Sequence, residues 1–143
     1  MSNISVYSKV MGESVNMALA NCTASGCNVR IVSYFFEESA PEVLYFTTFA
    51  GNDKCSEFAK NNRAAFTTIP PAEDVRHVRS RSAAVKKSSR KLDELLELIL
   101  SKMPGHVAAD PQLRQSLELY EIHVASANVV LSYDEDMGII FKA

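Results

Sequence analysis

Leu44-Tyr-Phe-Thr-Thr-Phe-Ala-Gly-Asn-Asp-Lys54 is the most informative stretch of this chain, and it runs directly into a short helical pattern at 55–60. A β-rich segment with hydroxyl groups ends at a glycine, a lysine follows, and a helix begins. This order suits an anion, because the N-terminus of a helix offers backbone N–H groups and the positive end of its dipole. Lys54 would add a positive charge, and Thr47 or Thr48 would add a hydroxyl donor. At most one threonine can do so, because neighbouring strand residues face opposite ways. The stretch therefore predicts a phosphate site.

The composition is that of a single domain, residues 1–143. Of the 143 residues, 47% are hydrophobic, which is enough to bury a sizeable core. The net charge of −2 gives no overall reason to expect nucleic acid or an acidic membrane as a partner. No run approaches the roughly 18 apolar residues of a membrane span, and the polar start of the chain does not resemble a signal peptide. We therefore expect a cytoplasmic protein with no membrane partner.

The three cysteines are an odd number, which argues against a disulfide framework. Cys22 and Cys27 flank a turn and could face each other across a hairpin. A metal site has little support, because the spacing of these two cysteines does not match a zinc-binding pair and the sequence has no second Cys/His pair to complete such a site. The simplest expectation is that these two and Cys55 are reduced thiols that pack as small hydrophobes.

Strands dominate the predicted secondary structure. Alternating or β-branched segments predict strands at 17–24, 28–36, 43–49, 64–69, 75–87, 119–133 and 138–142. Helical patterns occur at 6–15, at 53–62 with Asp53 as the cap, at 92–103, and at 111–117 after the cap Asp110. Successive strands with short turns and few helices indicate a mainly β fold (α+β class), an antiparallel barrel or sandwich. The chain contains neither a Gly-rich dinucleotide fingerprint nor a Walker loop, so nucleotide-binding folds do not explain the phosphate site.

Three motifs, taken in order, resemble one known family. Residues 28–36 are similar to the family strand that passes beneath a flavin ring, and 44–48 followed by Lys54 are similar to the family's phosphate-binding turn. Residues 58–65 resemble the end of the next helix and the strand after it. On these motifs the chain resembles the pyridoxamine 5′-phosphate oxidase-like superfamily, in its compact single-domain form. The resemblance implies an antiparallel split β-barrel with a few peripheral helices that binds FMN between two subunits.

The resemblance also implies roles for particular residues. The implied cofactor-binding set is Arg30, Ile31, Val32, Ser33, Thr47, Thr48, Asn52 and Lys54. The implied protein is an FMN-dependent oxidoreductase, a homodimer with its cofactor at the subunit interface, which passes electrons from NADH or NADPH to a small-molecule acceptor. We name no catalytic side chain, because the hydride chemistry belongs to the flavin. The alternative is a non-catalytic flavin or haem module, with deazaflavin or haem in place of FMN.

The chain departs from the family pattern at three positions. Asn52 stands where many relatives have a basic or hydroxyl residue, Asn62 replaces a common proline, and Ser82 stands where glycine is common. The Ser82 side chain could crowd a close backbone contact. Asp53 would repel a phosphate unless its carboxylate points away as a helix cap. These departures bear on the affinity for FMN more than on the fold.

A basic run at 76–91 contains seven of the fifteen Lys and Arg residues and no acidic residue. The run has no interleaved aromatic side chains, so we do not expect a nucleic-acid partner. Several of these charges are expected to lie in solvent or to pair with the acidic turn at 134–136. The three histidines, His77, His106 and His123, share no metal-ligand spacing.

Overall fold

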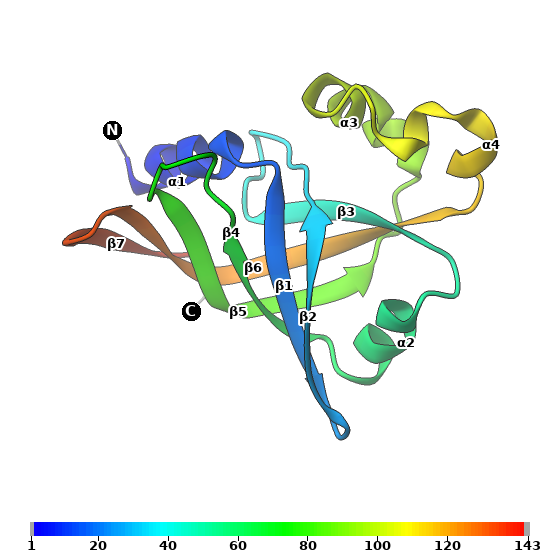
Figure 1. Cartoon of the computed structure of the whole chain (residues 1–143), viewed down its shortest axis with the longest axis horizontal. Coiled ribbons are helices and arrows are strands. Elements are labelled where there is room, and N and C mark those ends of the chain that lie inside the picture. The colour runs from blue at the N-terminus through cyan, green and yellow to red at the C-terminus, as the bar shows by residue number, and fades with distance from the viewer. Residues whose placement is uncertain (1, 142–143) are drawn as a thin grey trace.

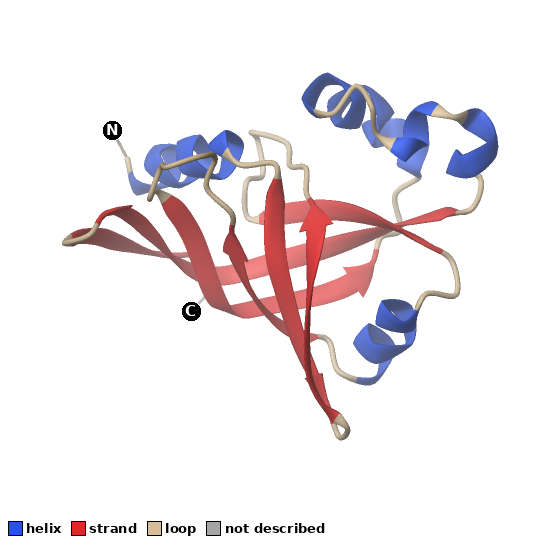
Figure 2. Cartoon of the chain, viewed as in Figure 1, coloured by secondary structure: helices blue, strands red, loops and turns tan. Residues whose placement is uncertain are grey.

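The computed structural model describes residues 2–141, which form one curled antiparallel sheet with helices around it (Figure 1, Figure 2). The strand order is β2-β1-β4-β5-β6-β3, and β7 pairs with β6. The strands are β1 (Asn16–Thr23), β2 (Gly26–Ser33), β3 (Val43–Phe49), β4 (Arg63–Thr68), β5 (His77–Lys87), β6 (Leu117–Ser132) and β7 (Glu135–Ile140). The predicted antiparallel split β-barrel is confirmed.

The 16 residues of β6 organise the sheet, because this strand is long enough to pair with three others. It pairs with β3 at its start, with β5 along its middle, and with β7 at its end. An isolated bridge between Phe35 and Tyr45 joins the chain after β2 to β3. The two ends of the sheet therefore approach each other, and the sheet curls into a half-barrel.

Helices cover the ends of the barrel (Figure 2). They are α1 (Asn3–Glu13), α2 (Asp53–Lys60), α3 (Leu96–Lys102) and α4 (Pro111–Arg114), with the 3₁₀ helices η1 (Leu92–Leu95) and η2 (Val107–Ala109). In Figure 1, α1 lies at the end near β7, α2 lies beside the β1–β2 hairpin, and α3 and α4 lie together at the opposite end from α1. Within residues 2–141, no helix is both long and apolar enough to cross a membrane.

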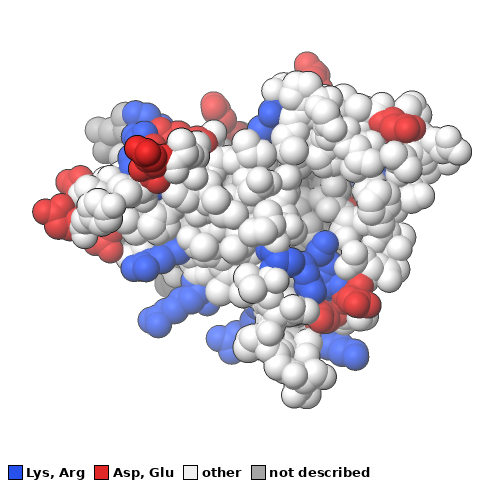
Figure 3. All heavy atoms as spheres, viewed as in Figure 1, with Lys and Arg blue, Asp and Glu red and all other residues white. Residues whose placement is uncertain are grey.

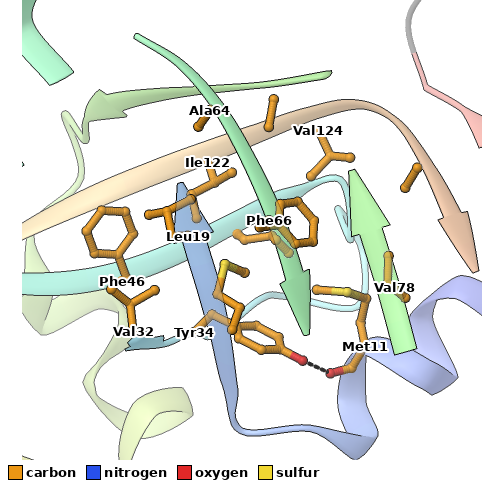
Figure 4. Packing of buried hydrophobic residues seen from close by; sticks show 14 of the residues in the cluster. Met11, Leu19, Val32, Tyr34, Phe46, Ala64, Phe66, Val78, Ile122 and Val124 are labelled. Carbon is orange, nitrogen blue, oxygen red and sulfur yellow. Dashed lines mark hydrogen bonds between the residues drawn. The ribbon is translucent and has the colours of Figure 1, made fainter. Parts of the chain in front are cut away.

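The main core lies inside the curl of the sheet (Figure 4). The Tyr7 hydroxyl donates to the Pro41 carbonyl at 3.1 Å, and the Tyr34 hydroxyl donates to the Met11 carbonyl, which ties α1 to the sheet. Burying a large apolar side chain contributes about 1.5–3 kcal/mol, so this core is the main source of stability. Its largest fully buried side chains are Tyr7, Met11, Met17, Leu19, Tyr34, Leu44, Phe46 and Ile122.

A second, smaller cluster fastens η1 and α3 to the sheet. Leu95 and Ile99, which lie four residues apart, are buried against Phe35, Tyr45 and Leu119. The predicted helix at 92–103 is confirmed, with a first turn that is 3₁₀. Its helical spacing of leucines therefore marks the face that packs on the barrel.

The first hairpin differs slightly from the prediction. Its turn is Ala24–Ser25, and β2 begins at Gly26, two residues before the predicted start at 28. β2 ends at Ser33, three residues before the predicted end. The Tyr34 N–H still donates to the Val15 carbonyl in the same register, but Phe35 then pairs with Tyr45 of β3, so the chain leaves β1 at this point.

Two boundaries near the C-terminus also differ. α4 ends at Arg114 and does not reach 117, because Leu117 already pairs with Phe49 as the first residue of β6. The last strand starts at Glu135, three residues before the predicted start, and its predicted end at 142 lies outside the described residues. The cap at Asp110 is confirmed, since its side chain accepts from the N–H of Gln112.

The expectation of three reduced thiols is wrong for one pair. Cys22 and Cys27 form a disulfide across the β1–β2 hairpin, and among the described residues only Cys55 is free. The antiparallel register places the two cysteines directly opposite each other, with their Cα atoms 3.9 Å apart. An odd count of cysteines excludes complete pairing but leaves room for one pair, so parity could not decide the matter.

Candidate functional site

The turn between β3 and α2 places Lys54 at the start of a helix. Gly51 adopts a φ of +82°, which glycine enters without strain, and the chain then turns into α2. Asn52 caps the helix, because its Oδ1 accepts from the Lys54 N–H at 3.1 Å. The prediction that Asp53 is the cap is therefore wrong. Asp53 is already helical, and Asn52 has the extended backbone of a cap.

A small pocket of about 240 Å³ opens beside this turn. It is surrounded by the end of β2, the end of β3, the start of α2, η2 and the start of β6. Seven of the eight residues predicted to bind a cofactor line it, namely Ile31, Val32, Ser33, Thr47, Thr48, Asn52 and Lys54. The fold thus brings together side chains from three separate segments of the chain. We call this pocket the Lys54 pocket.

Lys54 gives the pocket a positive charge without a counter-charge. Its Nζ lies 3.4 Å from Thr48 Oγ1, and it forms no ion pair with any residue between 2 and 141. Burial lowers the pKa of Lys54, and the positive charge of Arg30 lowers this pKa further. An anion in the pocket would oppose both effects, because it would stabilise the charged ammonium group.

His106 closes the other side of the Lys54 pocket, a role that the sequence did not reveal. Its Nδ1 accepts from the Ala108 N–H at 3.0 Å, so the neutral ring carries its proton on Nε2, which lies 3.3 Å from Thr47 Oγ1. Burial lowers the pKa of His106, which keeps the ring neutral at pH 7. No spacing in the sequence signals this position, because it depends on η2 folding back beside β3.

Arg30 is the one predicted site residue that does not line the pocket. Its Nη1 donates to Glu57 Oε1 on α2 at 3.1 Å and to Asn21 Oδ1 at 3.4 Å. Hydrogen bonds from Asn21 and Arg30 lower the pKa of Glu57, so this carboxylate is ionised at neutral pH. Arg30 on β2 therefore links the sheet to α2 through its ion pair with Glu57. Its contact with a cofactor remains a prediction.

Residues 31–33 of β2 line the pocket, and their side chains point alternately to the two faces of the sheet. Val32 points into the core and is 6% exposed, whereas Ile31 is 59% exposed on the outer face. The Ser33 hydroxyl donates to Asn16 Oδ1 at 2.8 Å, so it already has a partner within the barrel. What this strand offers a ligand is therefore its backbone and the Ile31 side chain.

A wider hollow of about 700 Å³ lies on the outer face of the sheet. Its floor includes the small side chains of Ala18, Ala20 and Ala65, and Val29 beside them is 64% exposed. Ser82 lines this hollow and not the Lys54 pocket of the same chain. Arg79 and Arg81 line the hollow on its β5 side, and Figure 3 shows Lys and Arg side chains gathered beside β2 and along the lower part of the view. We call this surface the outer face.

The basic run pairs with acidic residues other than those of the turn at 134–136. Arg76 pairs with Glu13 at 2.9 Å and with Asp74 at 3.0 Å, and Arg90 pairs with Glu37 at 2.7 Å. Between residues 2 and 141, no ion pair joins the run to the turn at 134–136. Five of its basic side chains are exposed, so the alternative that these charges lie in solvent is confirmed; they are Arg79, Arg81, Lys86, Lys87 and Lys91. Within the described residues, no cluster of three or more His, Cys, Asp or Glu side chains is arranged to hold a metal ion.

Solved structures share this fold at low sequence identity. A heme binding protein from Mycobacterium smegmatis superposes with a TM-score of 0.74 at 14% identity, over 98% of this chain and 58% of its own. Campylobacter jejuni ChuZ superposes with a TM-score of 0.72 at 13% identity, over 93% of this chain and 57% of its own. A NimC/NimA family protein from Clostridium acetobutylicum gives a TM-score of 0.69 at 14% identity, over 97% and 95% of the two chains. The chain thus spans less than two thirds of the first two proteins, and these similarities show the fold alone.

Family membership comes from the sequence. No curated protein matches the chain. A family model described as pyridoxamine 5′-phosphate oxidase-like matches residues 10–138, which include every strand except the last residues of β7. The protein therefore belongs to the pyridoxamine 5′-phosphate oxidase-like family.

Proposed function

We propose that this protein binds FMN in the Lys54 pocket and acts as a flavin-dependent oxidoreductase. The observation that carries the proposal is Lys54 itself, a partly buried cation with no ion-pair partner among residues 2–141, which lines a pocket together with six other predicted site residues. A phosphate group would supply the missing negative charge. Family membership supports the same ligand, because the resemblance implies FMN.

The phosphate end of FMN would lie at the start of α2. Lys54 Nζ would donate to the phosphate. Thr48 Oγ1, which lies 3.4 Å from Nζ, would keep the lysine side chain in place. The Oδ1 of Asn52 is occupied by the Lys54 N–H, which leaves its Nδ2 group to donate to an anion. The Asn52 departure from the family pattern is therefore compatible with a phosphate site.

The ring of FMN would lie along β2. The backbone of 31–33 and the Ile31 side chain would support one side of it, and the chain's role is to orient the ring and exclude water. When bound, the flavin supplies the hydride chemistry between NADH or NADPH and a small-molecule acceptor.

A second copy of the chain would complete the site. The Lys54 pocket of about 240 Å³ is smaller than the roughly 300–1,000 Å³ of typical cofactor pockets. The outer face has small side chains over β1 and β4, carries Arg79 and Arg81 on its β5 side, and ends at the edge strand β2 with the exposed Val29 and Ile31. Covering this face with a partner would bury apolar surface and protect the edge. We therefore propose a homodimer with the cofactor at the subunit interface.

The alternative is a non-catalytic flavin or haem module, which the similarity to the Mycobacterium smegmatis heme binding protein favours. His106 is the histidine that lines the Lys54 pocket. Its Nε2 would have to lose its proton to Nδ1 before it could bind iron, and Nδ1 is occupied by the Ala108 N–H. The ring is therefore held in a tautomer whose Nε2 is protonated and could not bind iron.

Absorption titrations with FMN and with haem, followed by NADH or NADPH, test these proposals. We expect FMN to bind, and Lys54→Ala to weaken binding by at least about tenfold, because a charge-assisted hydrogen bond is lost. Lys60→Ala, on the last turn of the same helix, is the matched control and should bind as the original protein does. Unchanged FMN affinity in Lys54→Ala would contradict the anchor. Bleaching of bound flavin by a nicotinamide nucleotide would support an oxidoreductase, and an inert flavin would support the module.

A further inference from the structure

The tip of the β1–β2 hairpin carries a disulfide outside the core. Cys22 and Cys27 are both exposed and lie one residue pair from the turn. The hairpin projects beyond the rest of the sheet, and α2 lies beside it (Figure 1). An exposed disulfide is open to thiol exchange, unlike one packed in an interior.

The next residue pair along the hairpin contacts α2. Asn21 lies opposite Asn28 in the ladder, and their Nδ2 groups donate to the two different oxygens of the Glu57 carboxylate, at 3.2 and 3.4 Å. Arg30 Nη1 adds a third bond to Glu57 Oε1 at 3.1 Å. The hairpin therefore holds one carboxylate of α2 from three positions on both of its strands.

Cys22 itself holds the end of α2. The C-cap residue Asn61 donates its Nδ2 to the Cys22 carbonyl at 2.9 Å. α2 has eight residues, and Phe58 is the one that is buried. A helix this short is not stable alone, so its position depends on these contacts with the hairpin.

We propose that Cys22 and Cys27 are a redox-active pair that exchanges with dithiols and controls how firmly the hairpin holds α2. A thiolate of the dithiol attacks one sulfur and displaces the other, and the second thiol then releases the mixed disulfide. The protein disulfide takes up two electrons and two protons, and the dithiol becomes a disulfide. A disulfide oxidant of the same class reverses the exchange.

The crosslink acts through the register of the hairpin. In the oxidised form it keeps Asn21 and Asn28 opposite each other, where both reach Glu57. In the reduced form the end of the ladder is free to fray, and α2 opens more often. Lys54 lies on the same helix, so reduction would also loosen its hold on a phosphate, and this last step alone rests on the proposed function.

Hydrogen exchange of α2 tests the proposal without a cofactor. We expect one titratable thiol in the oxidised protein and three after dithiothreitol. Exchange in the peptide covering 53–60 should become about fivefold faster on reduction, the change equivalent to losing one ordinary hydrogen bond. Exchange in β5 and β6 should not change, because the main core is untouched.

Variants separate the crosslink from other effects. The Cys22→Ser/Cys27→Ser protein should exchange at the reduced rate with and without dithiothreitol, and Cys55→Ala should still respond to it. Glu57→Gln should exchange rapidly in both states, because the charged acceptor is gone. Three titratable thiols in air-oxidised protein, or equal α2 exchange rates in the two states, would overturn the proposal. Failure to bind FMN would bear on the proposed function only.

Discussion

Tyr34 places an ionisable hydroxyl in the core, where it donates to the Met11 carbonyl. Burial raises the pKa of Tyr34 above its ordinary value of about 10, and burial does the same to the pKa of Tyr7. Above about pH 10 the unfolded chain loses these protons while the folded protein keeps them. The unfolded state is therefore favoured, and the free energy of unfolding falls as the pH rises through this range.

Replacing Tyr34 tests this alkaline loss of stability. We expect Tyr34→Phe to lower the free energy of unfolding at neutral pH by about 1–3 kcal/mol, because the buried Met11 carbonyl loses its donor. The further loss between about pH 9 and 11 should be smaller than in the original protein. Urea unfolding at several pH values measures both effects. Tyr133→Phe is the control, because Tyr133 is 96% exposed. Equal alkaline slopes in Tyr34→Phe and the original protein would contradict the assignment.

The burial of His106 predicts a loss of stability at acidic pH. Because burial lowers the pKa of His106, the unfolded chain binds a proton more readily than the folded protein below about pH 6.5. Stability is therefore lost as the pH falls through this range. Asn can accept from the Ala108 N–H but does not titrate. We expect His106→Asn to lose less stability than the original protein between about pH 7 and 5, measured by urea unfolding. The same loss in both proteins would show that this ring does not contribute.

At the scale of elements, α2 begins at Asn52. Asn52→Ala should lower the free energy of unfolding by about 1 kcal/mol, because the Lys54 N–H loses its acceptor. Asp53→Ala should cost less than about 1 kcal/mol, since it removes only an interaction with the helix dipole. Asn52→Asp should keep the cap but weaken FMN binding, because it adds a negative charge beside Lys54. Thermal unfolding and FMN titration measure these effects. A larger loss in Asp53→Ala than in Asn52→Ala would reverse the assignment of the cap.

At the scale of the whole molecule, the outer face predicts the oligomeric state. We expect the protein to sediment as a dimer and Val29→Glu to sediment as a monomer, because the interface would otherwise bury a lone charge. FMN affinity should fall when the dimer is lost, although Val29 does not line the Lys54 pocket. Ile4→Glu, on α1, is the control at another exposed apolar residue and should stay dimeric. A monomeric original protein would contradict the proposed interface.

Local patterns predicted the elements that bury one face. β3 has the predicted bounds 43–49, and the helix at 92–103 formed because Leu95 and Ile99 share a buried side. Predictions failed where a residue's partner comes from another segment. α4 ends before its predicted last residue because Leu117 pairs with Phe49 of β3. The local sequence of a segment does not specify a hydrogen bond whose partner lies in a distant strand.

The sequence by itself determined the fold class, the family, and the turn that carries Lys54 into α2, because periodicity, order and spacing along the chain are enough to specify them. The family resemblance also implied seven of the residues that converge on one pocket. Only the tertiary structure decided that Cys22 bonds to Cys27, that Arg30 turns to Glu57, and that His106 faces Thr47. Each of these pairings depends on strand register or on packing between distant segments, and no local pattern encodes which side chains will meet there.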